Sequence, residues 1–586
     1  MYTASPTRTP AVPVTASTAP AGGPVARVGP SLEVLLWLLV VAAAAGWRLI
    51  ALGAVPAAAP EALRARAAWE LAHGSSPGQS AGDLTTAVAA LIVRLGGDGL
   101  PWLRLWSALC GVAAVAALAL FRPYAGRAVS LGAAALVAVS PIAVAAARTL
   151  GPDSAALALG LVALWLILRL SFDGDRWALP WLAGVAGLAL GTGALALAMG
   201  AIAALWLAAE SVCGHPGVLQ HWRAAWRDGA TRRRALALFL IGLLPAVLRF
   251  GVGPDRLALA GLYDWSGAAS DVPLPWHAPL TLTALYEPPV LVLGVAGALV
   301  LVRAWWRDGA AVRPFERLLL VWLVAATVLT VMGLRARPGH LLVLSVPLAF
   351  LGVSATSRAL PFSARIRLRE SGLPLLPVPM LLGFTALRVL AWAKVGAAPP
   401  DEMVGVLAVL AASVVLVGYA LHRSWAALPG VLVAAVWLVS GWLLPNGAAT
   451  VAFHNGTEPA RGPRAAPERT ALVQSVQEAL AAGRSVSIEG PVAEALAWDL
   501  RGRIVPVHIG LAPDVDVAVI RVDAEMGYPA TGPGAVTVME RWYPAAPDLL
   551  GYVRWLVSRR GWGDVAALRA RAVAPSATSQ GRDAGP

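Results

Sequence analysis

Apolar runs of about twenty residues alternate with short polar segments over most of the chain, and runs of this length can cross the hydrocarbon core of a membrane as helices. The first covers residues 32–51. The others begin near Trp102, Arg127, Asp153, Trp177, Ala194, Ala235, Pro288, Leu318, Leu341, Leu373, Val404 and Leu428. The pattern predicts a polytopic helical bundle of about thirteen spans over residues 31–444. Between Trp177 and Glu210 it is ambiguous, because Gly191-Thr192-Gly193 fits either a tight turn or a flexible point within one long helix.

Two shorter segments stand out in the first loop, residues 54–101. Residues 59–74 have the mixed pattern of a short amphipathic helix, which places the carboxylate of Glu61 at the membrane surface. Residues 83–95 are too short to span a membrane, but Leu84, Val88, Leu91 and Leu95 share one helical face. We therefore expect a second helix, lying on the outer surface rather than crossing the membrane.

The pattern changes after the last apolar run. Residues 445–467 are polar and rich in Pro and Gly, as expected for a linker. Within residues 468–573, helical stripes alternate with short strand-like segments, which predicts a small α/β domain with a mainly parallel sheet. No glycine-rich phosphate loop follows any of these strands, so a nucleotide site is not expected there. Residues 1–30 and 574–586 lack apolar periodicity and are predicted to be disordered arms.

Composition supports the membrane assignment. The chain has 58% hydrophobic and 13% charged residues and a mean hydropathy of +0.68, whereas soluble proteins carry about 25% charged residues. The net charge of +13 does not indicate nucleic-acid binding, because the basic residues lie in short loops between apolar runs. The two cysteines, Cys110 and Cys213, form neither a disulfide framework nor a metal-ligand motif.

Arginine placement predicts the orientation. If the N-terminus is cytoplasmic and about thirteen spans follow, every arginine-rich loop faces the cytoplasm, as the positive-inside rule requires. The first loop, the turn between Arg148 and Asp153, and the C-terminal domain then lie outside. Membrane lipids are the only partners that the arginine clusters themselves imply.

Ionisable residues at the edge of this outer face are the candidates for chemistry, because charge close to a membrane is costly and often marks function. They are Glu61 with Arg64 as its expected partner, Arg148, Asp153, Glu287, Arg335, Arg337 and His340. Each has a purely structural alternative: Glu61 suits the N-terminus of its helix, and the arginines suit anchors at the interface. Three of the carboxylates, Glu61, Asp153 and Glu287, would suit a divalent cation if they converged, but the sequence requires no metal.

Several short motifs resemble those of the GT-C membrane glycosyltransferases, the group of the protein O-mannosyltransferases and the oligosaccharyltransferase catalytic subunits. The likeness is greatest to a bacterial and archaeal branch of flippase-activity-associated, mannosyltransferase-like proteins. The matching residues are Arg48-Leu49, Leu71-Ala72-His73-Gly74, Arg104-Leu105 with Gly111, Ser140-Pro141 followed by Arg148 and Asp153-Ser154, Tyr286-Glu287-Pro288, Trp498-Asp499-Leu500-Arg501 and Arg541-Trp542-Tyr543-Pro544. Their order and topology cover nearly the whole chain.

The resemblance implies transfer of a sugar, mannose or another hexose, from a polyprenyl-phosphate donor to a glycan, lipid or protein acceptor at the outer face. Glu61 would then be the general base and Asp153 a second acid or orienting group, with Arg148 and Arg337 at the phosphate. Arg64, Glu287, Arg335 and His340 would bind substrate or phosphate.

The chain also departs from the family, which usually has an acidic pair where this chain has Pro60-Glu61. A non-catalytic or degenerate homologue that assists lipid-linked glycan flipping is therefore the alternative. A structural membrane protein that presents an outer domain is a third.

Overall fold

The computed structural model describes residues 31–74, 84–212, 216–247, 278–307, 312–332, 338–365, 428–453, 464–503, 505–508, 515–521, 535–542 and 565–573, with the isolated residues 385, 404, 407–408, 410–415, 418 and 555. The predicted terminal arms, Arg335, Arg337 and most of the spans expected from Leu373 and Val404 lie outside these residues.

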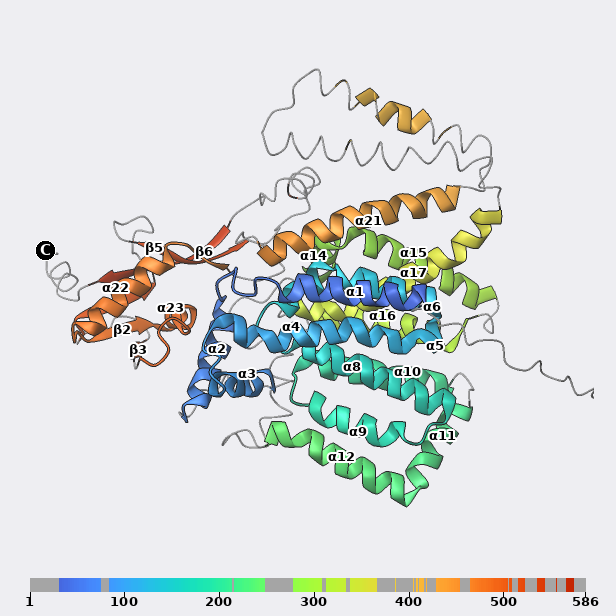
Figure 1. The fold of residues 1–586 in the computed structure, drawn as a ribbon, viewed down its shortest axis with the longest axis horizontal. Helices are drawn as coiled ribbons and strands as arrows, with labels where there is room; N and C mark the ends of the chain where they lie inside the picture. Colours follow the sequence, from blue (N-terminus) through green and yellow to red (C-terminus); the bar gives the residue numbers. More distant parts are fainter. Residues whose placement is uncertain are drawn as a thin grey trace, which may run out of the picture.

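Long helices stacked side by side form the body of the molecule (Figure 1). They are α1 (Leu32–Leu49), α4 (Leu100–Ala117), α6 (Arg127–Ala138), α7 (Pro141–Ala147), α8 (Asp153–Leu168), α9 (Ala178–Ala189), α10 (Ala194–Val212), α12 (Gly229–Val247), α15 (Pro288–Arg307), α16 (Pro314–Met332), α17 (Leu342–Arg365) and α21 (Leu428–Phe453). Short elements connect them: η1 (Leu118–Phe121), α5 (Arg122–Ala125), the π-helical η2 (Arg169–Asp173), α11 (Pro216–Arg227), α14 (Ala278–Tyr286) and η4 (Pro338–Leu341).

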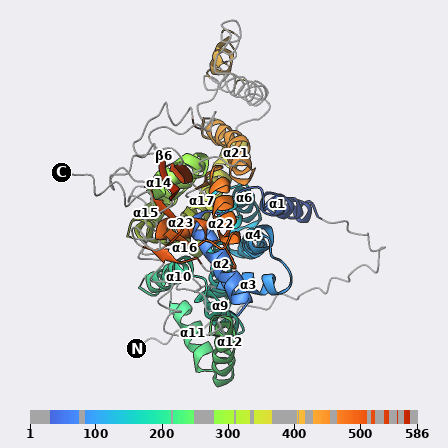
Figure 2. The same cartoon turned by 90° about the vertical axis from the view of Figure 1, so that its left-hand side faces the viewer.

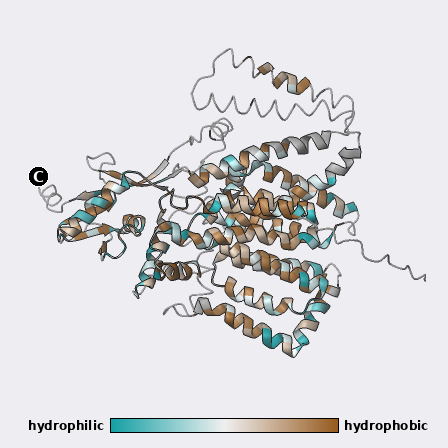
Figure 3. Ribbon diagram, in the orientation of Figure 1, coloured by the Kyte–Doolittle hydropathy of each residue, from teal (hydrophilic) through white to brown (hydrophobic). Residues whose placement is uncertain are grey.

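The body is a membrane-type helical bundle. In the described residues, seven helices are long and apolar enough to cross a membrane, or eight when a bent pair counts as one span. The expected total of about thirteen therefore stays a prediction. Apolar residues predominate along the long helices, whereas hydrophilic residues are more frequent on the first loop, on the C-terminal domain and at the opposite end around α11 (Figure 3).

The core of the bundle surrounds α17, whose spanning segment is 94% buried. Phe350 of α17 packs against Phe121 and Phe315, with ring centroids 5.8 and 5.3 Å away. Nearby, Trp206 and Trp322 are fully buried. This central helix is buried on all sides, which is why its sequence has no polar face.

One predicted span is interrupted, and the ambiguous pair is resolved. The run that starts at Arg127 is divided into α6 and α7, which meet at an angle of 63°. The ambiguous stretch between Trp177 and Glu210 forms two helices, α9 and α10, with Gly193 in a positive-φ conformation between them. The glycine pair therefore marks a turn rather than a flexible point in one helix.

The first loop contains the two expected helices, α2 (Ala59–Ala72) and α3 (Leu84–Arg94). In α3, Thr86, Ala89, Ala90 and Val93 are buried, whereas Leu91 and Leu95 are exposed. The facing helix α2 buries small residues, Ala62, Ala65 and Ala68, so the two helices pack closely through alanines.

The C-terminal domain contains α22 (Arg469–Ala481), α23 (Gly490–Leu496) and six strands, β1 (Arg464–Ala465), β2 (Val486–Glu489), β3 (Val507–His508), β4 (Val517–Arg521), β5 (Val536–Trp542) and β6 (Val565–Val573). The strand order is β1-β5-β6-β4-β2-β3. The expected mainly parallel sheet is wrong: β2 pairs in parallel with β3 and β4, but β6 pairs antiparallel with β4 and β5, as β1 does with β5.

The predicted start of the linker is also wrong, because α21 continues through Pro445 and ends only at Phe453. Packing explains the extension: Ala448 and Ala452 are buried against Val144 of α7 and the partly buried Trp47 of α1. Tertiary contact thus stabilises a turn of helix that its Pro, Asn and Gly residues disfavour on their own.

The C-terminal domain sits on the first loop. Ala497 and Trp498, just after α23, share a hydrophobic cluster with the alanine face of α2. Arg469 at the start of α22 donates from Nη1 to the carbonyl of Ala57, at 3.1 Å, and forms an ion pair with Asp499. Seen from this end, the domain lies in front of the bundle (Figure 2).

Candidate functional site

The bend between α6 and α7 is stabilised by a buried arginine from α1. Pro141 cannot donate a backbone hydrogen bond, so the helical ladder ends before it and leaves carbonyls free. Arg48 donates to two of them, with Nη1 2.8 Å from the oxygen of Ala138 and Nη2 3.0 Å from that of Val137. Ser140 caps the new helix by accepting from the N–H of Ala143 at 3.0 Å. Arg48 is thus a buried cap of a broken span.

A second buried arginine, Arg148 at the end of α7, caps the C-terminal end of α1. Its guanidinium donates to the carbonyls of Trp47, Ile50 and Ala51 at 3.1, 2.7 and 2.7 Å. Burial, together with the neighbouring Arg104, lowers the pKa of Arg148 to about 10, so the side chain stays charged at neutral pH. The expected role of Arg148 at a phosphate stays a prediction. In this structure its guanidinium hydrogen-bonds backbone carbonyls.

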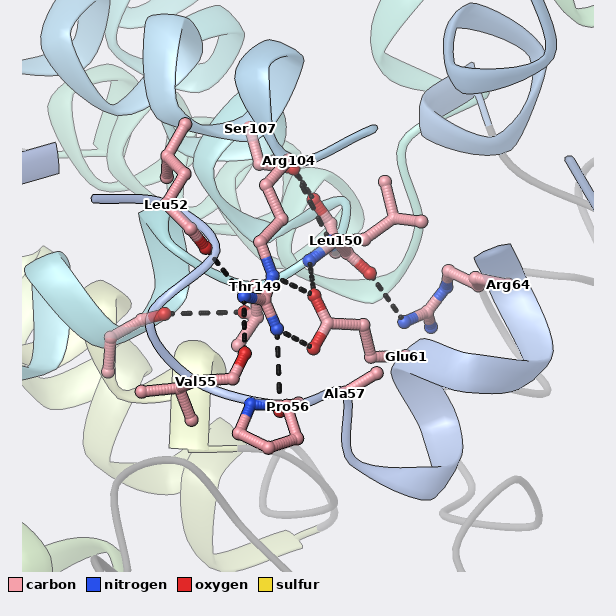
Figure 4. A network of polar contacts seen from close by, with 12 residues as sticks. Leu52, Val55, Pro56, Ala57, Glu61, Arg64, Arg104, Ser107, Thr149 and Leu150 are labelled. Carbon is pink, nitrogen blue, oxygen red and sulfur yellow. Dashed lines mark hydrogen bonds and ion pairs between the residues drawn. The ribbon is translucent and has the colours of Figure 1, made fainter. Parts of the chain in front are cut away.

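Glu61 and Arg104 form the centre of a third cluster (Figure 4). Arg104 Nε and Nη2 each lie 2.7 Å from one carboxylate oxygen of Glu61, a bidentate ion pair in which the glutamate is only 4% exposed. The N–H of Leu150 donates to the same carboxylate at 2.7 Å. The expected partner Arg64 instead donates to the carbonyl of Leu150, at 3.3 Å. Arg104 is therefore the bidentate partner of Glu61.

The same arginine also fixes the chain that precedes α2. Arg104 Nη1 donates to the carbonyls of Leu52 and Val55, both at 2.7 Å. On α4, Ser107 donates to the carbonyl of Gly151 at 3.0 Å, which ties the turn after α7 to the bundle. The first loop and this turn are therefore joined through one charged pair (Figure 4).

Asp153 lies directly beyond the turn, in the first turn of α8, where the helix dipole favours a carboxylate. His340 of η4 faces it, with Nε2 3.6 Å from Oδ1. Both are buried, Asp153 to 7% exposure and His340 completely. Gly339 allows this approach, because a Cβ there would lie 2.3 Å from Oδ2 of Asp153. The sequence analysis identified Asp153 and His340 as candidates but did not predict that their side chains face each other.

Glu287 belongs to a different neighbourhood. It lies between α14 and α15, is 1% exposed, and accepts a hydrogen bond from the hydroxyl of Ser140 at the bend of the broken span. The three candidate carboxylates do not form a metal site: among the residues that the structure describes, no group of three or more His, Cys, Asp or Glu side chains is placed to hold an ion.

The structure thus unites most of the predicted residues near one turn, residues 148–153. Glu61, Arg64, Arg148, Asp153 and His340 surround it, Glu287 contacts the bend behind it, and Arg335 and Arg337 lie outside the described residues. Sequence reasoning missed the structural roles of Arg48 and Arg104. The available signal was the presence of an arginine within each apolar run, which is costly unless a buried partner exists.

Part of the chain matches a family of known proteins, and its fold is similar to that of solved structures. The family described as dolichyl-phosphate-mannose-protein mannosyltransferase matches residues 84–220. The apo crystal structure of ArnT from Cupriavidus metallidurans is 16% identical, with a TM-score of 0.51 over 95% of this chain and 98% of that one. The chain has a GT-C fold.

Two further solved structures are similar to this chain. The apo oligosaccharyltransferase of Archaeoglobus fulgidus is 12% identical with a TM-score of 0.50; the match covers 80% of this chain and 63% of that protein. ArnT from Cupriavidus metallidurans bound to undecaprenyl phosphate gives a TM-score of 0.49 at 16% identity, covering 86% and 95% of the two chains. No curated protein is significantly similar in sequence.

Proposed function

We propose that this protein is a membrane glycosyltransferase that moves a sugar, mannose or another hexose, from a polyprenyl-phosphate donor to an acceptor at the extracytoplasmic face. The observation that carries the proposal is the GT-C fold, shared with ArnT over nearly the full length of both chains. ArnT itself has been solved with undecaprenyl phosphate bound, which supports a donor of the same lipid class.

The arrangement of the helices supports the position of the site. The first loop, the turn at residues 148–153 and the C-terminal domain lie at one end of the bundle, away from α5 and α11 (Figure 1). The positive-inside rule assigns this end to the outer face. A lipid donor would keep its chain beside the spans and present its sugar to this end.

We assign the general base to Asp153 and a positioning role to Glu61. A base must be able to accept the proton of the acceptor hydroxyl. Glu61 already accepts two hydrogen bonds from Arg104 and one from Leu150, whereas Asp153 faces His340 at 3.6 Å. Glu61 would then act through the turn that it holds.

Arg64 is the candidate for the departing phosphate. It lies on α2 next to the same turn and is only partly buried. A guanidinium there would stabilise the negative charge that develops on the leaving group. Arg335, Arg337 and His340 stay candidates for substrate or phosphate contacts, and Arg148 and Glu287 would support the backbone around them.

The test is sugar transfer by the purified protein in lipid nanodiscs, from labelled polyprenyl-phosphate mannose and glucose. Asp153→Asn should lower kcat by about 100-fold or more while the protein still folds. Glu61→Gln should reduce activity and thermal stability together. Asp175→Asn, remote from the turn at the far end of the same span, is the matched control and should transfer normally.

Full activity of Asp153→Asn would refute this assignment of the base. If the wild-type protein bound the donors but transferred no sugar, the non-catalytic role in glycan flipping would be the better account, consistent with the absence of an acid at Pro60.

A further inference from the structure

The parallel part of the C-terminal sheet has the topology of a ligand site. Strand β2 lies between β3 and β4 and runs parallel to both. The chain therefore leaves β2 toward β3 on one side, and later returns to β4 on the other side. Where the order of parallel strands reverses in this way, here between β2 and β4, the connections diverge, and ligands commonly bind at the carboxyl edge of such a sheet.

Residues able to bind a ligand stand at that edge. Strands β2, β3 and β4 end with Glu489, His508 and Arg521, respectively. Glu489 and His508 are register partners on neighbouring parallel strands, so their side chains leave the same face of the sheet. Their Cα atoms are separated by one strand spacing, about 4.8 Å. A carboxylate and an imidazole thus stand side by side.

Neighbouring groups orient both side chains. The backbone N–H of Arg521 donates to Oε2 of Glu489. Ser487, two residues before Glu489 on the same face, has its hydroxyl 2.6 Å from Nδ1 of His508. The other ring nitrogen, Nε2, is buried and has no hydrogen-bond partner within the described part of the chain. A buried nitrogen of this kind calls for a partner, and a ligand would supply one.

The edge faces the proposed transfer site. Glu489 immediately precedes α23, and α23 packs on α2, the helix that carries Glu61. Seven helical residues span about 10 Å. A ligand held at Glu489 and His508 would therefore lie close to the first loop rather than on the distant side of the domain.

We propose that Ser487, Glu489 and His508 form a binding site for a hydroxyl-rich ligand, the carbohydrate portion of an acceptor glycan. The proposal rests on the proposed function and specifies its acceptor class. Glu489 can accept hydrogen bonds from two sugar hydroxyls, and Nε2 of His508 can donate to or accept from a third. The carboxylate would repel a phosphate, which disfavours the lipid donor as the occupant.

The experiment is equilibrium binding of mannotriose and maltotriose to the full-length protein in nanodiscs, measured by saturation-transfer NMR and by titration. Glu489→Gln and His508→Gln should each weaken binding by about tenfold or more, because each removes a buried or charged hydrogen-bonding group. Ser487→Ala, which frees the His508 ring, should weaken it less. Asp516→Asn is the control, since Asp516 holds Ser485 at the opposite, amino edge of the same strands.

Binding and transfer are scored separately. Oligosaccharide binding that depends on Glu489 and His508 supports the site even if no sugar is transferred, in which case only the proposed function fails. Sugar transfer with an acceptor KM unchanged in both variants overturns the site and leaves the proposed function standing. Equal binding by wild type, Glu489→Gln and His508→Gln, or no binding to either trisaccharide, also overturns it.

Discussion

At the end of the bundle that carries α2 and α3, three buried arginines donate mainly to backbone carbonyls, whereas the buried Arg317 at the opposite end donates mainly to a carboxylate. Arg48, Arg104 and Arg148 together donate to carbonyls at the ends of α6 and α1 and in the loop before α2. Arg317 forms a bidentate pair with Glu210, at 2.8 and 3.0 Å, and donates to one carbonyl, that of Val312, at 3.0 Å.

The difference shows what each end must satisfy. Arg317 lies in the first turn of α16, where the helical carbonyls accept hydrogen bonds from the next turn, so its guanidinium is available for a carboxylate on a neighbouring helix. A chain that bends near the membrane leaves carbonyls that water cannot reach, and a guanidinium with five donors satisfies several of them at once. The irregular backbone at the site end is thus maintained by its arginines.

Replacing both members of each charged pair by apolar residues tests this comparison most directly. Glu210→Leu with Arg317→Met should be tolerated within about 1–2 kcal/mol, because apolar replacement of a buried pair is often neutral and only one carbonyl, that of Val312, loses its arginine donor. Glu61→Leu with Arg104→Met should cost about 3 kcal/mol or more, because the carbonyls of Leu52 and Val55 and the N–H of Leu150 lose their partners. Apparent melting temperatures in nanodiscs measure both, and equal losses would contradict the distinction.

A smaller effect is expected at Gly111 of α4. A Cβ there would lie 2.6 Å from Cβ of Ala147 and 3.1 Å from Cδ and Nε of Arg48. Gly111→Ala should therefore displace the arginine that caps the bend and destabilise the protein by about 1–3 kcal/mol. Gly200 of α10 has nothing within 4 Å of its Cβ position, so Gly200→Ala should be neutral or stabilising by up to about 1 kcal/mol. Thermal unfolding of the two variants checks the contrast.

The smallest effect is expected at the far end, where Glu33 of α1 pairs with Arg122 at 2.9 Å and both side chains are partly exposed. Glu33→Gln should cost no more than about 1 kcal/mol, and the loss should shrink as salt is added. Comparing the melting temperatures of wild type and variant at low and high salt measures it. A large, salt-independent loss would show that this pair, too, maintains backbone structure.

Local pattern predicted the local features well. The length and composition of the apolar runs indicated the bundle, and the helix carrying Glu61 was expected at residues 59–74 and found at Ala59–Ala72. The carboxylate at residue 153 and the histidine at residue 340 were also identified as candidates. Each of these inferences depends on residues close together in sequence.

The failures all involve partners distant in sequence. The sequence around Glu61 does not indicate that Arg104, 43 residues later, forms an ion pair with the Glu61 carboxylate. Helix α21 extends past Pro445 because residues of α7 and α1 cover it. The hydrophobic periodicity of a segment predicts the type of that one helix or strand. It does not predict which other element will pack against it.

The contact between Arg469 and Ala57 joins residues separated by 412 positions. In synthesis from the N-terminus, α2 and its neighbour α3 emerge early, but Ala497 and Trp498, which complete their hydrophobic cluster, are made far later. The loop that holds Glu61 therefore lacks this part of its cover until the C-terminal domain has been produced. A chain cut short before α22 would leave this side of α2 exposed to chaperones and proteases.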